Sequence, residues 1–264
     1  MKKLNSKDFE NLFEEGWFNL FKPFIESDEM ALIMNDLKER GSRGKVIFPY
    51  SKNLREKCPG WKSDNITFRA FKETPFDKLK VVLLGLSPYF SVENGSPIAD
   101  GLAFSTRHKK LPPSLKILYD AIDDDVYSKT ELTMQRNPSL QFLAEQGVLL
   151  LNSALTCEPQ MPTIHCKLWE PFMRYFFKEI VNKHCEGLHI VFFGEEAQKY
   201  RKIVNEARQG DLGFSNYHFL YSENHPAYHA RSNTKMETNV FSQINSKLSV
   251  PIKWDNCDWD DCPF

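Results

Sequence analysis

Four short apolar runs, separated by longer stretches with helical periodicity, limit the fold of this chain more than any other feature. The runs are rich in Val, Ile, Leu and Phe and are flanked by polar segments. Short apolar runs of this kind, without alternating polar residues, are typical of strands buried on both faces of a parallel sheet. They lie at 80–84, 148–151, 190–193 and 218–221.

Helical spacing of apolar residues fills the segments between these runs. Strands that alternate with helices indicate an α/β protein. We therefore predict a three-layer α/β/α sandwich with a central, mainly parallel four-stranded sheet. We divide the chain into an N-terminal helical segment (1–40) packed on the domain, a main domain (41–254) and an acidic, aromatic tail (255–264). The predicted helices lie within 8–40 and at about 113–124, 168–183, 195–207 and 235–248.

The residues that follow each predicted strand point to a site. In open parallel sheets, ligands bind beyond the carboxyl ends of the strands. Here those ends carry the turn Gly-Leu-Ser-Pro-Tyr-Phe (85–90), Asn152, Gly194 and the tripeptide Asn-His-Pro (224–226). An aromatic turn, one amide and one imidazole are therefore expected to converge on one edge of the sheet.

Composition and charge limit the classes of partner and cofactor that we expect for this chain. The net charge is −1, so a nucleic-acid partner would need a local basic patch. The six cysteines form no Cys-x-x-Cys pair and lack a ligand pattern, so we expect neither a metal nor another cofactor. The sequence contains no run of about 18 apolar residues and no signal-peptide pattern. We expect an intracellular monomer with reduced thiols and no membrane contact.

Several segments in a fixed order resemble family 1 uracil-DNA glycosylases over roughly residues 40–254. They read VVLLGLSPYF, DGLAFS, PPSL, GVLLLNSALT and NHPAYHA. The resemblance implies an enzyme that flips uracil out of DNA and hydrolyses its N-glycosidic bond, with DNA as the partner. It assigns base-binding positions to Leu86, Tyr89, Phe90, Phe104 and Asn152.

The resemblance also implies a role for individual side chains. Phe104 would stack on the flipped base, and Asn152 would read its Watson–Crick edge. Tyr89 would form the pocket wall near C5 of the ring. His225 would donate a hydrogen bond to the oxygen that becomes negative as the base leaves. Pro113 and Ser114 would belong to a loop that pinches the DNA backbone.

The catalytic turn departs from the family pattern, Gly-Gln-Asp-Pro-Tyr-His. Ser87 stands where the family has its Asp, and Phe90 where it has His. A serine hydroxyl can hold a water molecule but supplies no negative charge and no base near neutral pH. The loop after Tyr89 is also about four residues longer than in the family, and Asp100 or Glu93 from this loop is a candidate substitute carboxylate.

The DNA-contacting loop departs as well. The family sequence His-Pro-Ser-Pro-Leu-Ser inserts an apolar wedge into the base stack, whereas residues 225–230 read His-Pro-Ala-Tyr-His-Ala. We expect His229 at the wedge position, with Tyr228 beside it and Arg231 adding positive charge. Glu195 replaces a phosphate-binding Ser of the family.

Two functions remain open on the sequence alone. The first is a DNA glycosylase for uracil or a modified pyrimidine that uses a non-standard turn. The second is an inactive glycosylase fold that binds DNA or a replication partner, with the acidic tail as a docking element. Action on another nucleoside-like substrate is a third, weaker alternative, because only the altered pocket favours it.

Overall fold

A computed structural model describes residues 4–59, 61, 65–128, 134–185, 187–204 and 218–256. Its centre is a four-stranded sheet in the order β4-β1-β5-β6, in which every neighbouring pair is parallel. The predicted sandwich and its parallel sheet are therefore confirmed. The strands are β1 (Val81–Gly85), β4 (Val148–Asn152), β5 (His189–Phe193) and β6 (Phe219–Glu223).

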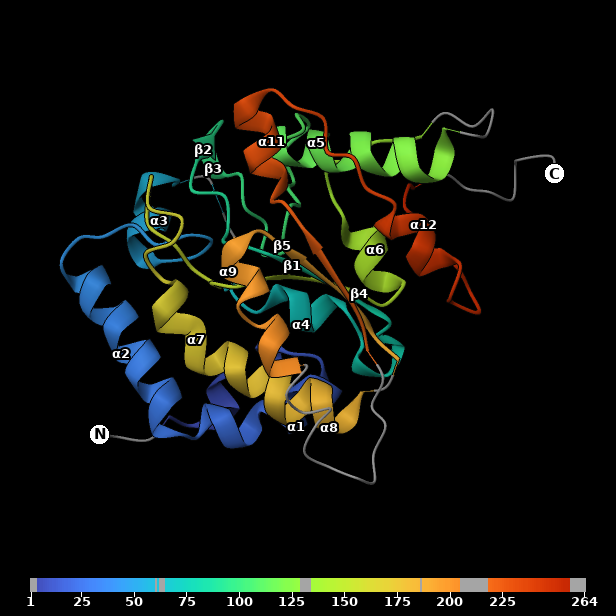
Figure 1. Ribbon diagram of the computed structural model, residues 1–264. Helices are drawn as coiled ribbons and strands as arrows, with labels where there is room; N and C mark the ends of the chain where they lie inside the picture. The colour runs from blue at the N-terminus through green and yellow to red at the C-terminus, as the bar shows by residue number, and fades with distance from the viewer. Residues whose placement is uncertain are drawn as a thin grey trace.

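Helices cover both faces of the sheet (Figure 1). On one side lie α1 (Glu15–Ile25), α2 (Asp28–Ser42), α7 (Cys166–Tyr175) and α8 (Asn182–His184). On the other side lie α5 (Pro113–Ile122), α6 (Gln141–Glu145), α11 (Pro226–Ser232) and α12 (Val240–Asn245). The other α-helices of the described residues are α3 (Lys52–Lys57), α4 (Arg69–Glu73) and α9 (Glu195–Gln198). Short 3₁₀ turns lie at Ser6–Asp8, Glu10–Leu12 and Phe76–Lys78, and π-helical turns continue α5 at Asp123–Tyr127 and α7 at Phe176–Val181.

Local capping explains where the N-terminal helices begin. The predicted helical stretch 8–40 opens with short 3₁₀ turns, and α1 begins only at Glu15 because the Glu14 carboxylate accepts hydrogen bonds from the next turn. α1 ends at Ile25, and Ser27 then caps α2 by accepting a hydrogen bond from the Met30 N–H. The helix predicted at 235–248 is also shorter, since α12 starts at Val240.

The helices at 15–42 share one aromatic core with the rest of the domain. The Phe21 ring stacks on Phe172 of α7, with centroids 4.7 Å apart and planes within 4° of parallel. The Trp17 indole is fully buried and donates to the Thr74 carbonyl at 2.7 Å. This packing fixes the helical layer under the sheet and leaves the opposite, carboxyl end of the strands for the site.

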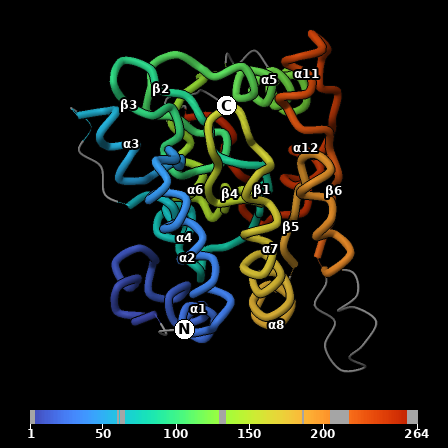
Figure 2. The backbone as a smooth tube through the Cα atoms, turned by 90° about the vertical axis from the view of Figure 1, so that its left-hand side faces the viewer, coloured from blue at the N-terminus to red at the C-terminus, as the bar shows by residue number. Residues whose placement is uncertain are grey.

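The carboxyl end of the sheet is framed by two projections. After β1 the chain forms a hairpin of β2 (Val92–Glu93) and β3 (Ser96–Pro97). Asn94 and Gly95 have φ values of 52° and 73°, as a tight Asn-Gly hairpin turn requires. Figure 2 shows this hairpin and α11 on opposite sides of the same end of the molecule, with α5 next to α11.

The C-terminal strap is anchored at its beginning. Trp254 is fully buried and packs edge-on against Phe241 of α12 at 5.0 Å. The buried Asp255 carboxylate accepts a hydrogen bond from the Tyr127 hydroxyl at 3.2 Å. Residues 257–264, on which the predicted docking role of the tail depends, lie outside the described residues. No helix of the described chain is long and apolar enough to cross a membrane.

Candidate functional site

The floor of the site is the end of two paired strands. Gly85 of β1 lies beside Asn152 of β4 in the parallel register. A β-carbon at Gly85 would lie 2.8 Å from Asn152 Oδ1 and 3.1 Å from the Phe104 ring. Only glycine therefore lets the amide and the ring meet over the strand end. Asn152 is 8% exposed, and among the described residues its side-chain amide has no hydrogen-bond partner.

Phe104 reaches this floor through an unusual backbone conformation. Its φ is +66°, in the left-handed region that bulky residues rarely adopt. The buried ring meets Phe193 edge-on at 5.3 Å and lies 5.5 Å from the His225 ring. The aromatic ring, the amide and the imidazole that were expected to converge do lie together.

Tyr89 connects the turn after β1 (85–90) to the wall of the site. Its hydroxyl donates to the Phe104 carbonyl at 3.0 Å and shares a 2.8 Å hydrogen bond with the Ser114 hydroxyl. Burial raises the pKa of the Tyr89 phenol above its usual value, so the hydroxyl stays protonated. Ser114 is buried in the first turn of α5, whereas its neighbour Pro113 is exposed.

His225 is held as a neutral donor. It caps α11, and its Nδ1 accepts from the Ala227 N–H at 3.1 Å. The ring proton must then sit on Nε2. Burial, together with the smaller effect of the positive charge of Arg231, lowers the His225 pKa to about 4. At neutral pH, His225 therefore offers an uncharged N–H, which can hydrogen-bond a developing anion without becoming charged itself.

A buried thiol supports the catalytic turn from behind. The Cys157 S–H donates to the Pro88 carbonyl at 3.2 Å. Burial raises the pKa of Cys157 to about 12, opposed by a hydrogen bond with the Ser87 side chain. The Ser87 side chain of the turn therefore has an uncharged thiol as its neighbour. Leu86 and Phe90 are each half-buried, Leu86 against the main core and Phe90 against a separate cluster that includes Cys157.

Asp100 is held inside the protein. Its carboxylate pairs with Arg69 Nη1 at 2.9 Å and accepts from the Ser105 hydroxyl and the Leu102 N–H. The side chain is 1% exposed. Both oxygens are engaged in these contacts, which favours a structural role over the catalytic role expected from the sequence. The other candidate carboxylate, Glu93, lies on the hairpin, 4.0 Å from His108 Nδ1.

The loop at α11 presents a different side chain from the one expected. His229 was expected to occupy the wedge position, but it is 9% exposed and its Nδ1 shares a 3.0 Å hydrogen bond with the Thr234 hydroxyl. Tyr228 is instead 52% exposed. The helical spacing of α11 turns one residue inward and its neighbour outward, so Tyr228 is the residue free to contact a ligand. Arg231 and Glu195 are both exposed.

Fold and site together define a class of protein. A parallel sheet whose carboxyl edge brings together a stacking ring, a free amide and a neutral imidazole N–H is suited to a planar heterocyclic base. A family model described as "Uracil DNA glycosylase superfamily" matches residues 71–249. The chain belongs to the uracil-DNA glycosylase superfamily, and the resemblance noted from the sequence is confirmed.

Curated relatives cover nearly the whole chain. It is 30% identical over 247 residues to the uracil-DNA glycosylase of Pseudomonas paraeruginosa, which covers 91% of this chain and 94% of the relative. It is 32% identical over 248 residues to the uracil-DNA glycosylase of Acinetobacter baumannii, with 91% and 92% covered.

Solved structures show the same fold. The crystal structure of mimivirus uracil-DNA glycosylase matches with a TM-score of 0.74 and 24% identity, over 96% of this chain and 90% of that chain. A variant of the mimivirus protein in complex with UGI matches with a TM-score of 0.75 and 23% identity, over 96% and 92%. At these identities, the likeness concerns the fold alone.

Several residues that shape the site were not singled out from the sequence. The Arg69 partner of Asp100 and the Cys157 thiol behind the turn come from distant segments, and no local pattern marks them. The hairpin could have been recognised, because Asn94-Gly95 between short strands is a strong turn signal. Across the described residues, no group of three or more His, Cys, Asp or Glu is arranged to hold a metal ion.

Proposed function

We propose that this protein binds an extruded pyrimidine in DNA, uracil in the first place, and hydrolyses its N-glycosidic bond slowly. The observation that carries the proposal is the Asn152 amide, which lies over Gly85 and against Phe104 and finds no partner among the described residues. An amide that no protein group occupies keeps both its oxygen and its NH₂ group available, and the edge of a base would supply partners for both.

Each side chain has a role in this proposal. The Asn152 oxygen would accept from N3–H of uracil while its NH₂ group donates to O4. Phe104 would stack on the ring, and His225 Nε2 would donate to O2 as the bond to the sugar breaks. Tyr89, fixed by its two hydrogen bonds, would stand against substituents on the far side of the ring.

The proposed rate is low because the turn lacks a charged group. Ser87 would hold the attacking water but would not stabilise a cationic sugar. Removal of a single preorganised electrostatic group usually lowers a rate about 10²- to 10³-fold. Asp100 cannot readily replace that group, because its carboxylate is already bound to Arg69.

The second candidate is a protein that recognises the base without excising it. The engagement of Asp100 with Arg69 favours this candidate, since no step in it needs a catalytic carboxylate. Association with a protein partner through residues 255–264 would belong to this second function, and it stays a prediction.

The experiment uses single-stranded oligonucleotides that carry one uracil, one cytosine or one thymine at the same place, followed by alkali cleavage of abasic sites. We expect slow cleavage at uracil by the wild type and none by Asn152→Ala. A matched control, Asn53→Ala, removes an amide whose hydrogen bonds lie remote from the site, at the Gly41 and Lys45 carbonyls. Uracil binding without cleavage would establish the second candidate. Absence of both would overturn the proposal.

A further inference from the structure

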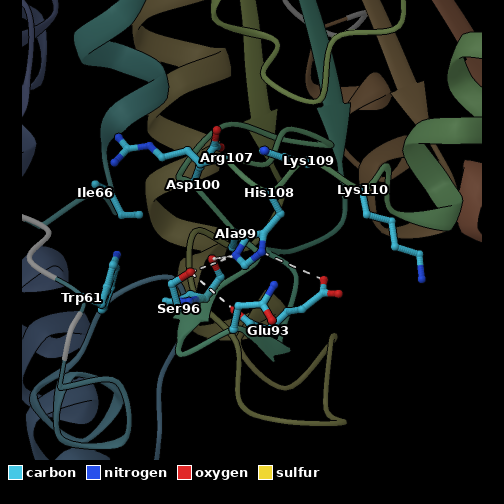
Figure 3. A pocket seen from close by; sticks show the side chains of 12 residues that line it. Trp61, Ile66, Glu93, Ser96, Ala99, Asp100, Arg107, His108, Lys109 and Lys110 are labelled. Carbon is cyan, nitrogen blue, oxygen red and sulfur yellow. Dashed lines mark hydrogen bonds and ion pairs between the residues drawn. The ribbon is translucent and has the colours of Figure 1, made fainter.

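A cavity lined by residues of the β2–β3 hairpin lies outside the base site. Its volume is about 440 Å³, and none of Tyr89, Phe104, Asn152 and His225 lines it. Figure 3 shows it from close by, with Trp61 and Arg107 on one side of His108 and Lys110 on the other. The hairpin comes from the loop that the sequence analysis found to be longer than in the family.

His108 holds the hairpin that forms one wall of this cavity. Its Nε2 lies 3.0 Å from the Ser96 hydroxyl and 3.1 Å from the Pro97 carbonyl. A carbonyl oxygen only accepts, so Nε2 carries the proton and cannot act as a base toward Ser96. The Glu93–His108–Ser96 series is therefore a clamp that holds the hairpin, rather than a nucleophile with its base. The cavity walls are preformed.

Free positive charge surrounds the cavity. Arg107, Lys109 and Lys110 are all exposed, and within the described part of the chain none of them has an ion-pair partner. Of the two carboxylates that line the cavity, Asp100 is neutralised by Arg69, and Glu93 remains. Three unpaired cations against one carboxylate favour an anionic ligand, in a chain whose net charge is −1.

An aromatic face completes the cavity. Trp17, Trp169 and Trp254 are fully buried, whereas Trp61 is half-exposed and lines the cavity opening. Its ring lies 6.3 Å from that of Tyr50. Exposed aromatic rings next to a basic groove bind unpaired bases, because stacking is available to every base while the cations meet the backbone phosphates.

We propose that this cavity binds a nucleotide of single-stranded DNA adjacent in the strand to the extruded base. The inference rests on the proposed function and names the form of DNA it acts on. Arg107 follows Phe104 by three positions, so the Cα atoms of these two residues, one from each site, are at most about 11 Å apart. A base stacked on Trp61 must be unpaired, which requires single-stranded DNA at this position.

The test uses a fluorescein-labelled thymidine decamer, which contains no uracil, and the full chain with Trp259→Phe to remove one further tryptophan. Binding is followed by anisotropy and by quenching of tryptophan fluorescence. We expect quenching by the decamer in this parent protein. Trp61→Phe should lose the quenching and keep affinity, whereas Trp61→Ala should lose both, with Kd rising about tenfold.

The contribution of the positive charges to DNA binding is tested with a separate variant. Arg107→Ala/Lys110→Ala should weaken binding and flatten the dependence of log Kd on log salt by about 1.4, at about 0.7 for each lost phosphate contact. The matched control, Lys22→Ala/Lys38→Ala, removes two exposed cations from α1 and α2 and should leave both unchanged.

Three outcomes would overturn the inference. Decamer binding that is indifferent to Trp61→Ala and to the charge variant would place the strand elsewhere and leave the proposed function standing. Equal competition by inorganic phosphate and by thymidine monophosphate would reduce the cavity to an anion site. No binding of the decamer, with or without a uracil, would remove the inference and the proposed function together.

Discussion

The side-chain oxygen of Asn152 occupies the space into which any side chain at residue 85 would project. A β-carbon at Gly85 would come within 2.8 Å of that oxygen, closer than carbon and oxygen pack. The strand end and the amide therefore depend on each other: the missing side chain on β1 gives the amide on β4 its position against Phe104.

This dependence predicts that Gly85→Ala removes base binding. The added methyl group must displace the Asn152 amide or the Phe104 ring, and overpacking of this kind costs about 1–3 kcal/mol of folding free energy. Uracil excision or binding is measured together with urea unfolding. The control is Gly41→Ala in α2, where the β-carbon meets nothing within 4 Å and the change should be neutral or stabilising. Unchanged uracil binding by Gly85→Ala would show that the amide does not read the base.

Ser87→Asp is predicted to raise uracil excision about 10²-fold or more. The substitution places a carboxylate in the turn, where it can stabilise a cationic sugar and orient water. Asn has nearly the shape of Asp but no charge, so Ser87→Asn should excise uracil at the wild-type rate. Single-turnover excision by the three proteins decides between them. An equal rise for Asn and Asp would attribute the gain to geometry rather than charge.

Asp100→Asn is expected to destabilise the protein by about 3 kcal/mol, because it breaks the buried ion pair with Arg69 and leaves Glu73, which is 30% exposed, as the remaining carboxylate partner of that guanidinium. Urea unfolding measures this loss. Glu93→Gln, at a carboxylate that is 42% exposed, should change stability little. If Asp100→Asn instead abolished excision at unchanged stability, the carboxylate would be catalytic after all.

Stability is predicted to fall as the pH drops from about 6.5 to about 4. The His225 pKa is lowered to about 4 in the folded protein, while the unfolded chain takes up a proton near its ordinary value of about 6.5. Between these values the unfolded state binds more protons, so the free energy of unfolding decreases toward acid. The His189 pKa is lowered to about 4 by burial and adds to the effect.

Urea unfolding at a series of pH values measures this dependence. His225→Gln should reduce the slope between pH 6.5 and 4, and the exposed His184→Gln should leave it as it is. Identical slopes for the wild type and His225→Gln would mean that His225 titrates alike in both states.

The two neighbours on α11 should respond in opposite ways. Tyr228→Ala removes a half-exposed ring and is expected to weaken DNA binding with almost no change in stability. His229→Ala removes a buried ring bonded to Thr234 and should lower stability by about 1–2 kcal/mol. Melting curves and DNA titrations of both variants test this. A loss of DNA affinity confined to His229→Ala would restore that residue to the wedge position.

Much of the architecture could be predicted from the sequence, because buried parallel strands appear in a sequence as continuous apolar runs. Topology then placed the Gly85 turn, Asn152 and His225 at one edge, since carboxyl ends of parallel strands must meet there. The buried ion pair of Asp100 could not be predicted. Its partner Arg69 lies 31 residues earlier in the chain, and only the folded packing brings the two together.

Which side chains of α11 are exposed could not be predicted either, for a related reason. Alignment with a family motif assigns a residue to a position, but the rotation of a short helix decides which side chain emerges. His229 finds Thr234 through the left-handed cap at Asn233, a contact that depends on backbone geometry rather than residue type.

Phe104 is the position at which folding and the proposed stacking on a base make opposing demands. A bulky residue with φ near +66° costs about 1–3 kcal/mol, which Gly or Asn would largely avoid. A chain under pressure only to fold would do better without a ring there. Replacement of Phe104 by Gly or Asn to raise thermal stability would therefore remove the aromatic ring. The stabilised variant would lose the surface on which we propose that a base stacks.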